Sequence, residues 1–303
     1  MTQNAPIPSD LRRWVSSHLP GAEQVTDVSW PRGSSRVWRF GSGADAVFVK
    51  QSPTARDYER EIGGYAYAAR ALAAHEAPRL LASDRDLQAI MTSRQPGGVV
   101  RGLPLDVGEE RRVHELAGHL LRRWHDHSEP ASEQDRENIR ASMANQAEEA
   151  AACLESTAGH LDKQQQALVQ CVARELPQLA GAVPAVYRHG DYSTRNWMWH
   201  PEHGHGVIDF EMAAPGIAVE EFVWLCGAVW VVRPDLKAAY FSGYGRPLSE
   251  DEERVLRLLT TRLGVSYLDS GLTKEQPHLV ERGHLILTRM THEYRSRSKP
   301  AMP

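Results

Sequence analysis

The chain has 303 residues, of which 41% are hydrophobic and 24% are charged, and its formal net charge is −4. This composition is typical of soluble globular proteins and argues against a mainly disordered chain. No apolar run approaches the roughly 18–20 residues of a membrane span, and no apolar secretory signal follows the first Met, so we expect a cytoplasmic protein without a membrane partner. The three cysteines, Cys153, Cys171 and Cys226, are widely spaced, which argues against a disulfide framework and a cysteine zinc site.

The charge is unevenly divided along the chain. Residues 1–96 carry 12 Lys and Arg against 10 Asp and Glu, a balance of +2, and residues 97–303 carry 23 against 29, a balance of −6. A nucleic-acid binder would show a basic patch, so we expect no nucleic-acid partner. The acidic second part is compatible with a cationic small-molecule partner, although solvated surface charge gives the same balance.

The first third of the chain alternates short β-rich runs with helical patterns. Residues 9–20 predict a short helix with Ser9 as its N-cap, and the Ala-rich residues 55–75, with apolar positions three or four apart, predict a longer one. Runs rich in Val, Trp and Phe, separated by Gly, Pro and Asp, predict strands over 25–30, 34–40, 46–50 and 87–93.

Long helical patterns dominate after a Pro- and Gly-containing segment at residues 93–98. Two short β-like pieces, 196–200 and 205–209, interrupt them. The sequence therefore predicts an α+β protein of two lobes, a small β-rich N-lobe over 1–96 and a larger, mainly helical C-lobe over 97–303, with a ligand cleft between them. Helices are expected over 109–127, 134–158, 162–176, 218–232, 249–263 and 276–297.

Lys50 ends the predicted strand "AVFVK", and Glu59 and Glu61 lie in the helix that follows. A lysine at a strand end can neutralise nucleotide phosphates, and an acidic residue on the adjacent helix can hold its ammonium group in place. Taken alone, the pattern is more typical of a solvated lysine, so its weight depends on the rest of the chain.

The segment "HGDYSTRN" places Asp191 and Asn196 five residues apart in one loop, and Asp209 ends the apolar run "GVID" shortly after. Asp191 can accept the proton of an attacking hydroxyl group. Magnesium prefers few protein oxygens together with substrate phosphates, so Asn196 and Asp209 are sufficient as ligands. This spacing predicts phosphoryl transfer from a magnesium-bound nucleotide.

These segments, together with "LAGHLLRRWHDH" at 116–127, resemble the aminoglycoside phosphotransferase and choline-kinase-like enzymes, small-molecule kinases related to protein kinases. The resemblance covers roughly residues 25–230 and implies a two-lobed protein-kinase-like fold. It implies Asp191 as the catalytic base, Asn196 and Asp209 as metal ligands, and Lys50 as a phosphate contact. Glu61 is the better-spaced partner for Lys50, with Glu59 as the alternative.

The resemblance also implies a nucleotide loop and a hinge. The turn "PRGSSR", with Gly33, Ser34 and Ser35, would cover the phosphates, although it has one Gly where the protein-kinase loop has three. The hinge, from Met91 to Ser93, would offer backbone groups to the purine of ATP or GTP.

Other residues near these motifs admit two interpretations. Glu211 either touches the metal or braces the loop, and Arg195 either stabilises the transferring phosphate or only solvates the loop. We expect His189 to brace the catalytic loop. The histidine-rich segment 200–206 is expected to be an exposed hairpin turn rather than a metal site.

No "DFG" or "APE" motif follows Asp209, which disfavours a protein kinase. We therefore expect an enzyme that moves the γ-phosphoryl group of Mg-ATP or Mg-GTP to a hydroxyl of an antibiotic of the aminoglycoside, nucleoside or peptide type, which would confer resistance. The alternatives are a metabolite kinase of the choline or homoserine type and a non-catalytic nucleotide-binding sensor. The acceptor would be small and hydroxylated, and the protein a monomer or homodimer.

Overall fold

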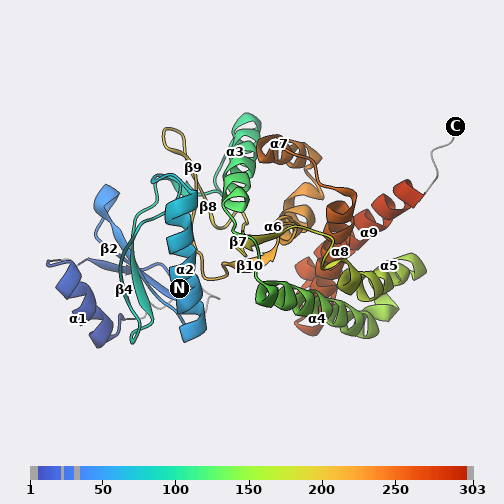
Figure 1. Ribbon diagram of the computed structural model, residues 1–303, viewed down its shortest axis with the longest axis horizontal. Coiled ribbons are helices and arrows are strands. Elements are labelled where there is room, and N and C mark those ends of the chain that lie inside the picture. The colour runs from blue at the N-terminus through green and yellow to red at the C-terminus, as the bar shows by residue number, and fades with distance from the viewer. Residues whose placement is uncertain (1–5, 22–23, 31–34, 299–303) are drawn as a thin grey trace. The chain divides into compact units, whose positions relative to one another are not determined.

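The computed structural model describes residues 6–21, 24–30 and 35–298, which form two compact units (Figure 1). The first unit contains the described residues up to Leu105 and the later segment His189–Ala214. The second contains Asp106–Arg188 and the described residues from Pro215 onward. The segment that carries "HGDYSTRN" thus belongs to the same unit as Lys50. The division by role into residues 1–96 and 97–303 stays a prediction.

A five-stranded antiparallel sheet forms the centre of the first unit, in the order β1-β2-β3-β5-β4. The sequence pattern did not predict β4, because this edge strand is half exposed and has no clear apolar alternation. The other four strands match predicted runs. The bounds are Val25–Asp27 for β1, Arg36–Phe40 for β2, Val47–Gln51 for β3, Leu80–Asp84 for β4 and Ala89–Ser93 for β5.

The two faces of this sheet have different partners, because side chains alternate along each strand. Helix α1 (Ser9–His18) covers one face with Leu11 and Val15, and α2 (Ala55–Ala71) contacts the other (Figure 1). The buried side chains of the α1 face include Trp38, Phe40, Val47, Val49, Ala89 and Met91. The opposite face carries Val37, Arg39, Phe48, Lys50, Ile90 and Thr92, which line a cavity.

A second, three-stranded antiparallel sheet also lies in the first unit. Its order is β6-β8-β9, with β6 at Gly98–Val99, β8 at Trp197–His200 and β9 at Gly204–Val207. Both predicted β-like pieces are confirmed. Trp197 and Trp199 are buried in the core. The N–H of Ile208 donates to the carbonyl of Asn196, which extends the pairing toward the segment with Asp209.

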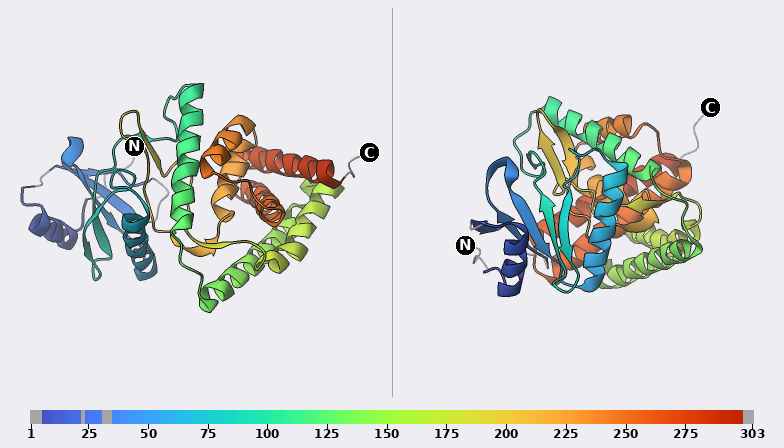
Figure 2. Two further views of the ribbon diagram at one scale, coloured as in Figure 1. Left: turned by 45° about the horizontal axis from the view of Figure 1, so that its top comes forward. Right: turned by 60° about the vertical axis from the view of Figure 1, so that its left-hand side comes forward.

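The second unit is mainly helical (Figure 2). Short strands, β7 (Ala185–Arg188) and β10 (Ala214–Ile217), form a pair. Capping boxes start α3, α4, α5 and α8, the last of them formed by Ser249 and Glu252. The helices are α3 (Val107–Asp126), α4 (Glu133–Thr157), α5 (Lys163–Glu175), α6 (Glu220–Leu225), α7 (Pro234–Tyr244), α8 (Glu250–Thr273) and α9 (Pro277–Ser298).

The predicted helix boundaries fail at three places in this unit. The helix expected over 249–263 continues as α8 to Thr273. The helix expected over 218–232 is α6 followed by a π-helical turn, Cys226–Trp230. Helix α7 was not predicted, although Pro234 at its start and Gly245, with φ 77°, at its end are ordinary boundary signals. The α+β prediction, with a small antiparallel sheet and a larger helical part, is confirmed.

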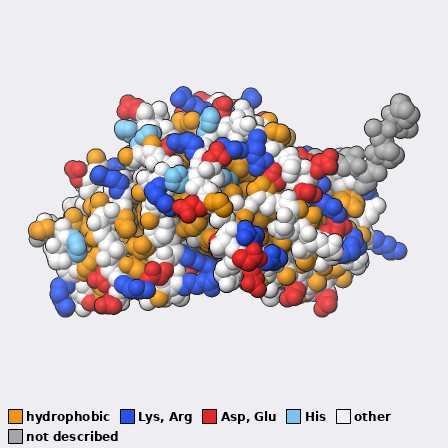
Figure 3. Space-filling model, viewed as in Figure 1, with side chains coloured by type: hydrophobic (Ala, Val, Ile, Leu, Met, Phe, Trp, Pro, Cys, Tyr) orange, Lys and Arg blue, Asp and Glu red, His pale blue; other side chains and the backbone are white. Residues whose placement is uncertain are grey.

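Two features of the described residues bear on possible partners: whether a helix could span a membrane, and how charge is distributed on the face shown in Figure 3. None of the described helices combines the length and apolarity needed to cross a bilayer. Acidic and basic side chains are interspersed over that face (Figure 3).

Helices α3 and α7 cross so closely that glycine is required at the contact. A Cβ at Gly118 would overlap the carbonyl oxygen of Tyr240, and one at Gly243 would overlap that of Glu115. Both obstacles are backbone atoms, so a side chain cannot move aside to relieve the overlap.

We expect Gly118→Ala to lower the free energy of unfolding by at least about 1–3 kcal/mol, because it forces the two helices apart. Gly159→Ala is the matched control, since a Cβ there meets nothing within 4 Å. It should change stability by less than about 1 kcal/mol. Urea unfolding of both variants measures the difference, and equal effects would show that the crossing is not tight.

Candidate functional site

A cavity of about 610 Å³ lies wholly within the first unit. Its walls are the α2 side of the five-stranded sheet and residues from β6, β8 and the segment after β9. Apolar side chains such as Phe48, Met198 and Ile208 line it together with Lys50 and Asp209. Such a mixture of apolar walls and a few convergent polar groups is typical of ligand sites.

Lys50 contacts three carboxylates in this cavity. Its Nζ lies 2.6 Å from an oxygen of Asp209, 2.9 Å from one of Glu211 and 3.1 Å from one of Glu61. The structure thus pairs Lys50 with Glu61, while Glu59 is exposed and pairs with Arg85 at 2.8 Å.

These charges shift one another's protonation equilibria. Burial alone would lower the pKa of Lys50, but Asp209, Glu61 and Glu211 outweigh it and raise the pKa well above its usual value. Burial would likewise raise the pKa of Asp209, but Lys50 outweighs it and lowers this pKa. Lys50 and Asp209 therefore form a fully charged pair near neutral pH.

Glu61 is the carboxyl group whose burial Lys50 offsets only in part. It is 1% exposed, and burial raises its pKa to about 7 despite the opposing effect of Lys50. Three carboxylates around one ammonium group leave an excess of negative charge, and Glu61 takes up part of that excess as a bound proton.

Asp191 is held by two neighbours in its own loop. Its Oδ2 accepts from Nε and Nη2 of Arg195, at 2.8 and 2.7 Å, and from Nδ2 of Asn196, at 2.8 Å. Three donors on one oxygen leave Oδ1 as the oxygen of Asp191 that can accept from a ligand. Of the two interpretations of Arg195, the structure shows neither: the side chain is an ion-pair partner of Asp191.

Asn196 and His189 join the loop to the segment after β9. The Nδ2 of Asn196 also donates to the carbonyl of Asp191 at 3.0 Å, so its Oδ1 is the atom that a cation could use. The imidazole of His189 is fully buried, with Nε2 3.1 Å from the carbonyl of Ile208 and Nδ1 accepting from the N–H of Asp191 at 3.3 Å. His189 therefore braces the loop, as predicted.

Two backbone features fix the positions of Asp191 and Asp209. Gly190 has φ 87°, and a Cβ there would overlap the carbonyl oxygen of Met212, so the two loops meet at a point where only glycine fits. Asp209 itself has φ 72°, a left-handed conformation that Asp tolerates better than most residues. Such conformations are often found at functional sites.

The hinge prediction, Met91 to Ser93, concerns backbone groups and stays a prediction; the structure shows where its side chains lie. Ser93 lines the cavity, although its N–H already donates to the carbonyl of Arg79. Met91 is 2% exposed and packs in the core under α1, because it is opposite Val49 in the sheet and shares its face. Its neighbour Thr92 lines the cavity instead.

The expected nucleotide loop is described only at its end. Gly33 and Ser34 lie outside the described residues. Ser35 lines the cavity, and its hydroxyl donates to Glu211 at 2.7 Å. Glu211 thus links Ser35 to Lys50, a contact that the sequence could not show because it joins residues 176 positions apart.

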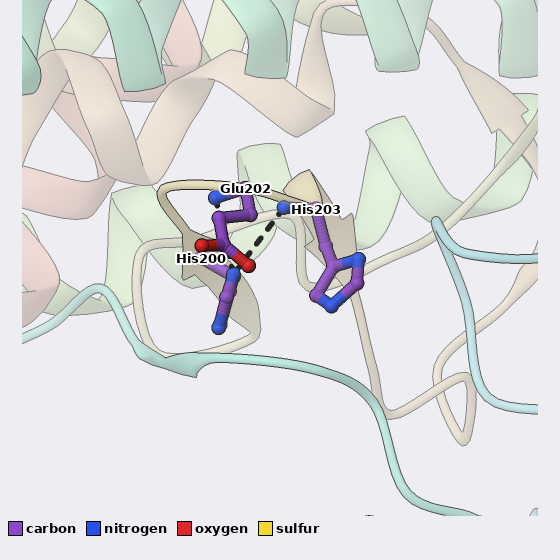
Figure 4. Close-up of side chains that lie close together, drawn as sticks. All are labelled: His200, Glu202 and His203. Atoms are coloured by element: carbon purple, nitrogen blue, oxygen red, sulfur yellow. Dashed lines mark hydrogen bonds between the residues drawn. The ribbon is translucent and has the colours of Figure 1, made fainter.

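The histidine-rich segment forms the turn between β8 and β9, as predicted (Figure 4). The possible ligand atoms of His200, Glu202 and His203 lie within 4.8 Å of one another. However, Nδ1 of His200 accepts from the N–H groups of Glu202 and His203, at 3.1 and 3.3 Å. A neutral imidazole has one lone pair for ligation, and here the turn uses it, so this conformation does not offer His200 to a metal.

Solved structures share this fold at low sequence identity. Spectinomycin phosphotransferase APH(9)-Ia, in complex with ADP and spectinomycin, is 14% identical with a TM-score of 0.61, over 98% of this chain and 96% of that one. The GDP complex of an aminoglycoside 2′-phosphotransferase-IIIa variant is 14% identical with a TM-score of 0.66, over 96% and 99%. APH(3″)-Id from Streptomyces rimosus is 18% identical with a TM-score of 0.55, over 84% and 98%.

A comparison with curated proteins found no match. The family model described as "Phosphotransferase enzyme family" matches residues 31–259, well over half of the chain, and these residues include Lys50, Asp191, Asn196 and Asp209. This match confirms the resemblance that the motifs indicated: the chain belongs to the phosphotransferase enzyme family.

Proposed function

We propose that this phosphotransferase moves the γ-phosphoryl group of Mg-ATP or Mg-GTP to a hydroxyl group of a small molecule, and that the acceptor is an antibiotic. One observation carries the proposal: the ammonium group of Lys50 lies among Glu61, Asp209 and Glu211 in a cavity that Asn196 also lines. This cavity holds both a cation for phosphate oxygens and oxygen donors for a metal.

Lys50 would bind the phosphates of the nucleotide. Glu61 is buried behind it and would keep the ammonium group in place, while Asp209 and Glu211 are partly exposed and can give up their contact to a phosphate. The exchange of a carboxylate for a phosphate oxygen keeps Lys50 paired throughout.

Magnesium fits the residues that are present. The excess of negative charge around Lys50 favours a cation, and the carboxylate of Asp209 and Oδ1 of Asn196 are the hard oxygen donors that Mg²⁺ prefers. When bound, the ion would neutralise charge on the phosphate oxygens.

Asp191 would orient the acceptor hydroxyl and accept its proton on Oδ1. Arg195 and Asn196 occupy Oδ2 and so fix which oxygen faces the acceptor. The protein's contribution is then positioning and charge stabilisation, which together supply most of the rate enhancement in phosphoryl transfer.

An antibiotic acceptor is supported by two observations. The structural neighbours include complexes named for gentamicin, streptomycin and spectinomycin, and the residues after 97 carry the acidic balance of −6 that suits a cationic acceptor. Hydroxylated metabolites are the alternative acceptors, and a transfer assay on both kinds of compound distinguishes them from antibiotics.

The first prediction on activity concerns Asp191. Asp191→Asn should lower turnover by about 10²–10⁴-fold, because a carboxamide cannot accept the hydroxyl proton, while Mg-nucleotide affinity stays nearly unchanged. Mass spectrometry of a panel of hydroxylated antibiotics and metabolites, incubated with Mg²⁺ and ATP or GTP, detects the transfer. The exposed Asp86→Asn is the control and should keep full activity.

One acceptor phosphorylated by the wild type and by Asp86→Asn, but not by Asp191→Asn, would support both the reaction and the base. Full turnover by Asp191→Asn would show that another group takes the proton. If the wild type phosphorylated metabolites but no antibiotic, the proposed reaction would stand and the proposed acceptor would change.

Asp209→Ala should affect binding as well as turnover. Its carboxylate is proposed as a metal ligand, so the variant should lose the part of the nucleotide affinity that depends on magnesium. Titration calorimetry with and without Mg²⁺ measures this part for the wild type, Asp209→Ala and Asp86→Asn. A magnesium effect that survives in Asp209→Ala would remove Asp209 from the metal site.

Glu61 predicts a specific dependence of stability on pH. Its pKa in the folded protein, about 7, lies above the ordinary 4.5, so between these values the folded state binds more protons than the unfolded state. The stabilisation is complete below pH 4.5 and is lost as the pH rises through 7. The free energy of unfolding of the wild type, relative to Glu61→Gln, should therefore fall by up to about 3 kcal/mol over this window.

Urea unfolding at several pH values measures this difference without any nucleotide. Glu59→Gln is the matched control. Because Glu59 is exposed on the same helix, the difference in free energy of unfolding between the wild type and this variant should not change with pH. If the difference in free energy of unfolding for Glu61→Gln were also independent of pH, Glu61 would stay charged throughout and the cluster would hold no excess charge.

A further inference from the structure

Arg39 places a guanidinium group in the same cavity, away from the carboxylates. It lies on β2 opposite Phe48, two residues along the strand from Val37, which lies opposite Lys50. Two residues of a strand span about 7 Å, so Arg39 and Phe48 mark a separate part of the cavity from Lys50. The acidic residues that line the cavity are Glu61, Asp209 and Glu211, and all three contact Lys50.

Arg39 is half-buried, and no ion pair of its guanidinium group is found among the described residues. Its Nε is buried without a hydrogen bond. The other arginine of the cavity wall, Arg94, donates to the carbonyl of Gly43 at 2.8 Å and is exposed. A buried donor left unpaired is unfavourable, and a ligand with acceptor atoms would remove that cost.

The surroundings of Arg39 suit the base of a nucleotide. Phe48, Ala46, Val99 and Met198 give this part of the cavity apolar walls, which fit a flat ring. If phosphates bind Lys50, as the proposed function requires, the base lies away from Lys50, toward Phe48 and Arg39. The following inference rests on that function.

We propose that Arg39 contacts the edge of the base and makes GTP the preferred phosphoryl donor. A guanidinium group only donates hydrogen bonds. Guanine presents two acceptors side by side, O6 and N7, which one guanidinium can bind together, whereas adenine presents an amino donor at N6 beside N7. Arg39 therefore matches guanine and meets a donor on adenine.

Binding of nucleotides to the whole chain, by titration calorimetry with Mg²⁺, tests the preference. GTP should bind roughly 5- to 150-fold more tightly than ATP, the range that one bidentate contact gives. Arg39→Ala should remove the difference by weakening GTP. Arg39→Gln should favour ATP, because a carboxamide pairs with N6 and N7 of adenine. Arg85→Ala is the control, because Arg85 is exposed and does not line the cavity, and it should keep the preference of the wild type.

Nucleotide analogues test the contact without any substitution in the protein. ITP keeps O6 and N7 and should share the advantage of GTP over ATP, and 7-deaza-GTP lacks N7 and should lose most of it. Arg39→Ala should bind GTP and 7-deaza-GTP alike.

Equal binding of ATP and GTP by the wild type would overturn this inference and leave the proposed function standing. A uniform loss of both nucleotides in Arg39→Ala would overturn it too, because Arg39 would then contact the ribose or phosphates. Failure of the wild type to bind either nucleotide would overturn the proposed function itself, and the preference with it.

Discussion

One ammonium group among three carboxylates is the interaction on which the site depends. Lys50 comes from β3, Glu61 from α2, and Asp209 and Glu211 from the segment after β9, so one cluster joins three parts of the first unit. Removing Lys50 would leave three buried or half-buried carboxylates without a counterion, a cost of several kcal/mol. The close contact of Gly190 with Met212 holds the loop of Asp191 against the segment that carries Asp209. Structural and proposed catalytic roles therefore coincide in the same residues.

The charges of the cavity are separated, and this gives a bound ligand a direction. Lys50 and the three carboxylates that contact it form one group, while Arg39 lies opposite Phe48, two residues along β2 from the position opposite Lys50. A ligand that enters must bring anionic groups with a cation to this group and acceptor atoms to Arg39. A magnesium-bound nucleotide has this distribution, since its phosphates and its base are held apart by the ribose. The polarity of the cavity thus argues for the orientation of the nucleotide independently of the hinge.

The sequence predicted those parts of the fold and site that depend on local patterns. Asp191, Asn196 and His189 lie within one short loop, so their spacing alone placed them together, and the strand before Lys50 and the helix with Glu61 followed from periodicity. Contacts that depend on strand register could not be predicted from the sequence. Met91 faces the core because it lies opposite Val49 in the sheet, and the Ser35–Glu211 contact joins distant segments. Strand β4 and helix α7 were missed because their burial comes from neighbours rather than from their own apolar pattern.

The strand register shows on which face of the sheet Arg39 lies, which its sequence position alone does not. In the sequence it is one of two arginines in its strand, and a solvated side chain is the natural interpretation. The pairing of β2 with β3 puts the large apolar Trp38 and Phe40 on the core face, which leaves Val37 and Arg39 on the face of the cavity. An aliphatic residue would complete an apolar wall there, so the buried, unpaired Nε of Arg39 is the feature that a bound ligand would explain. The donor nucleotide is the ligand that this cavity is proposed to bind, and its base is the group proposed to contact Arg39, which lies on β2 two residues from the position opposite Lys50.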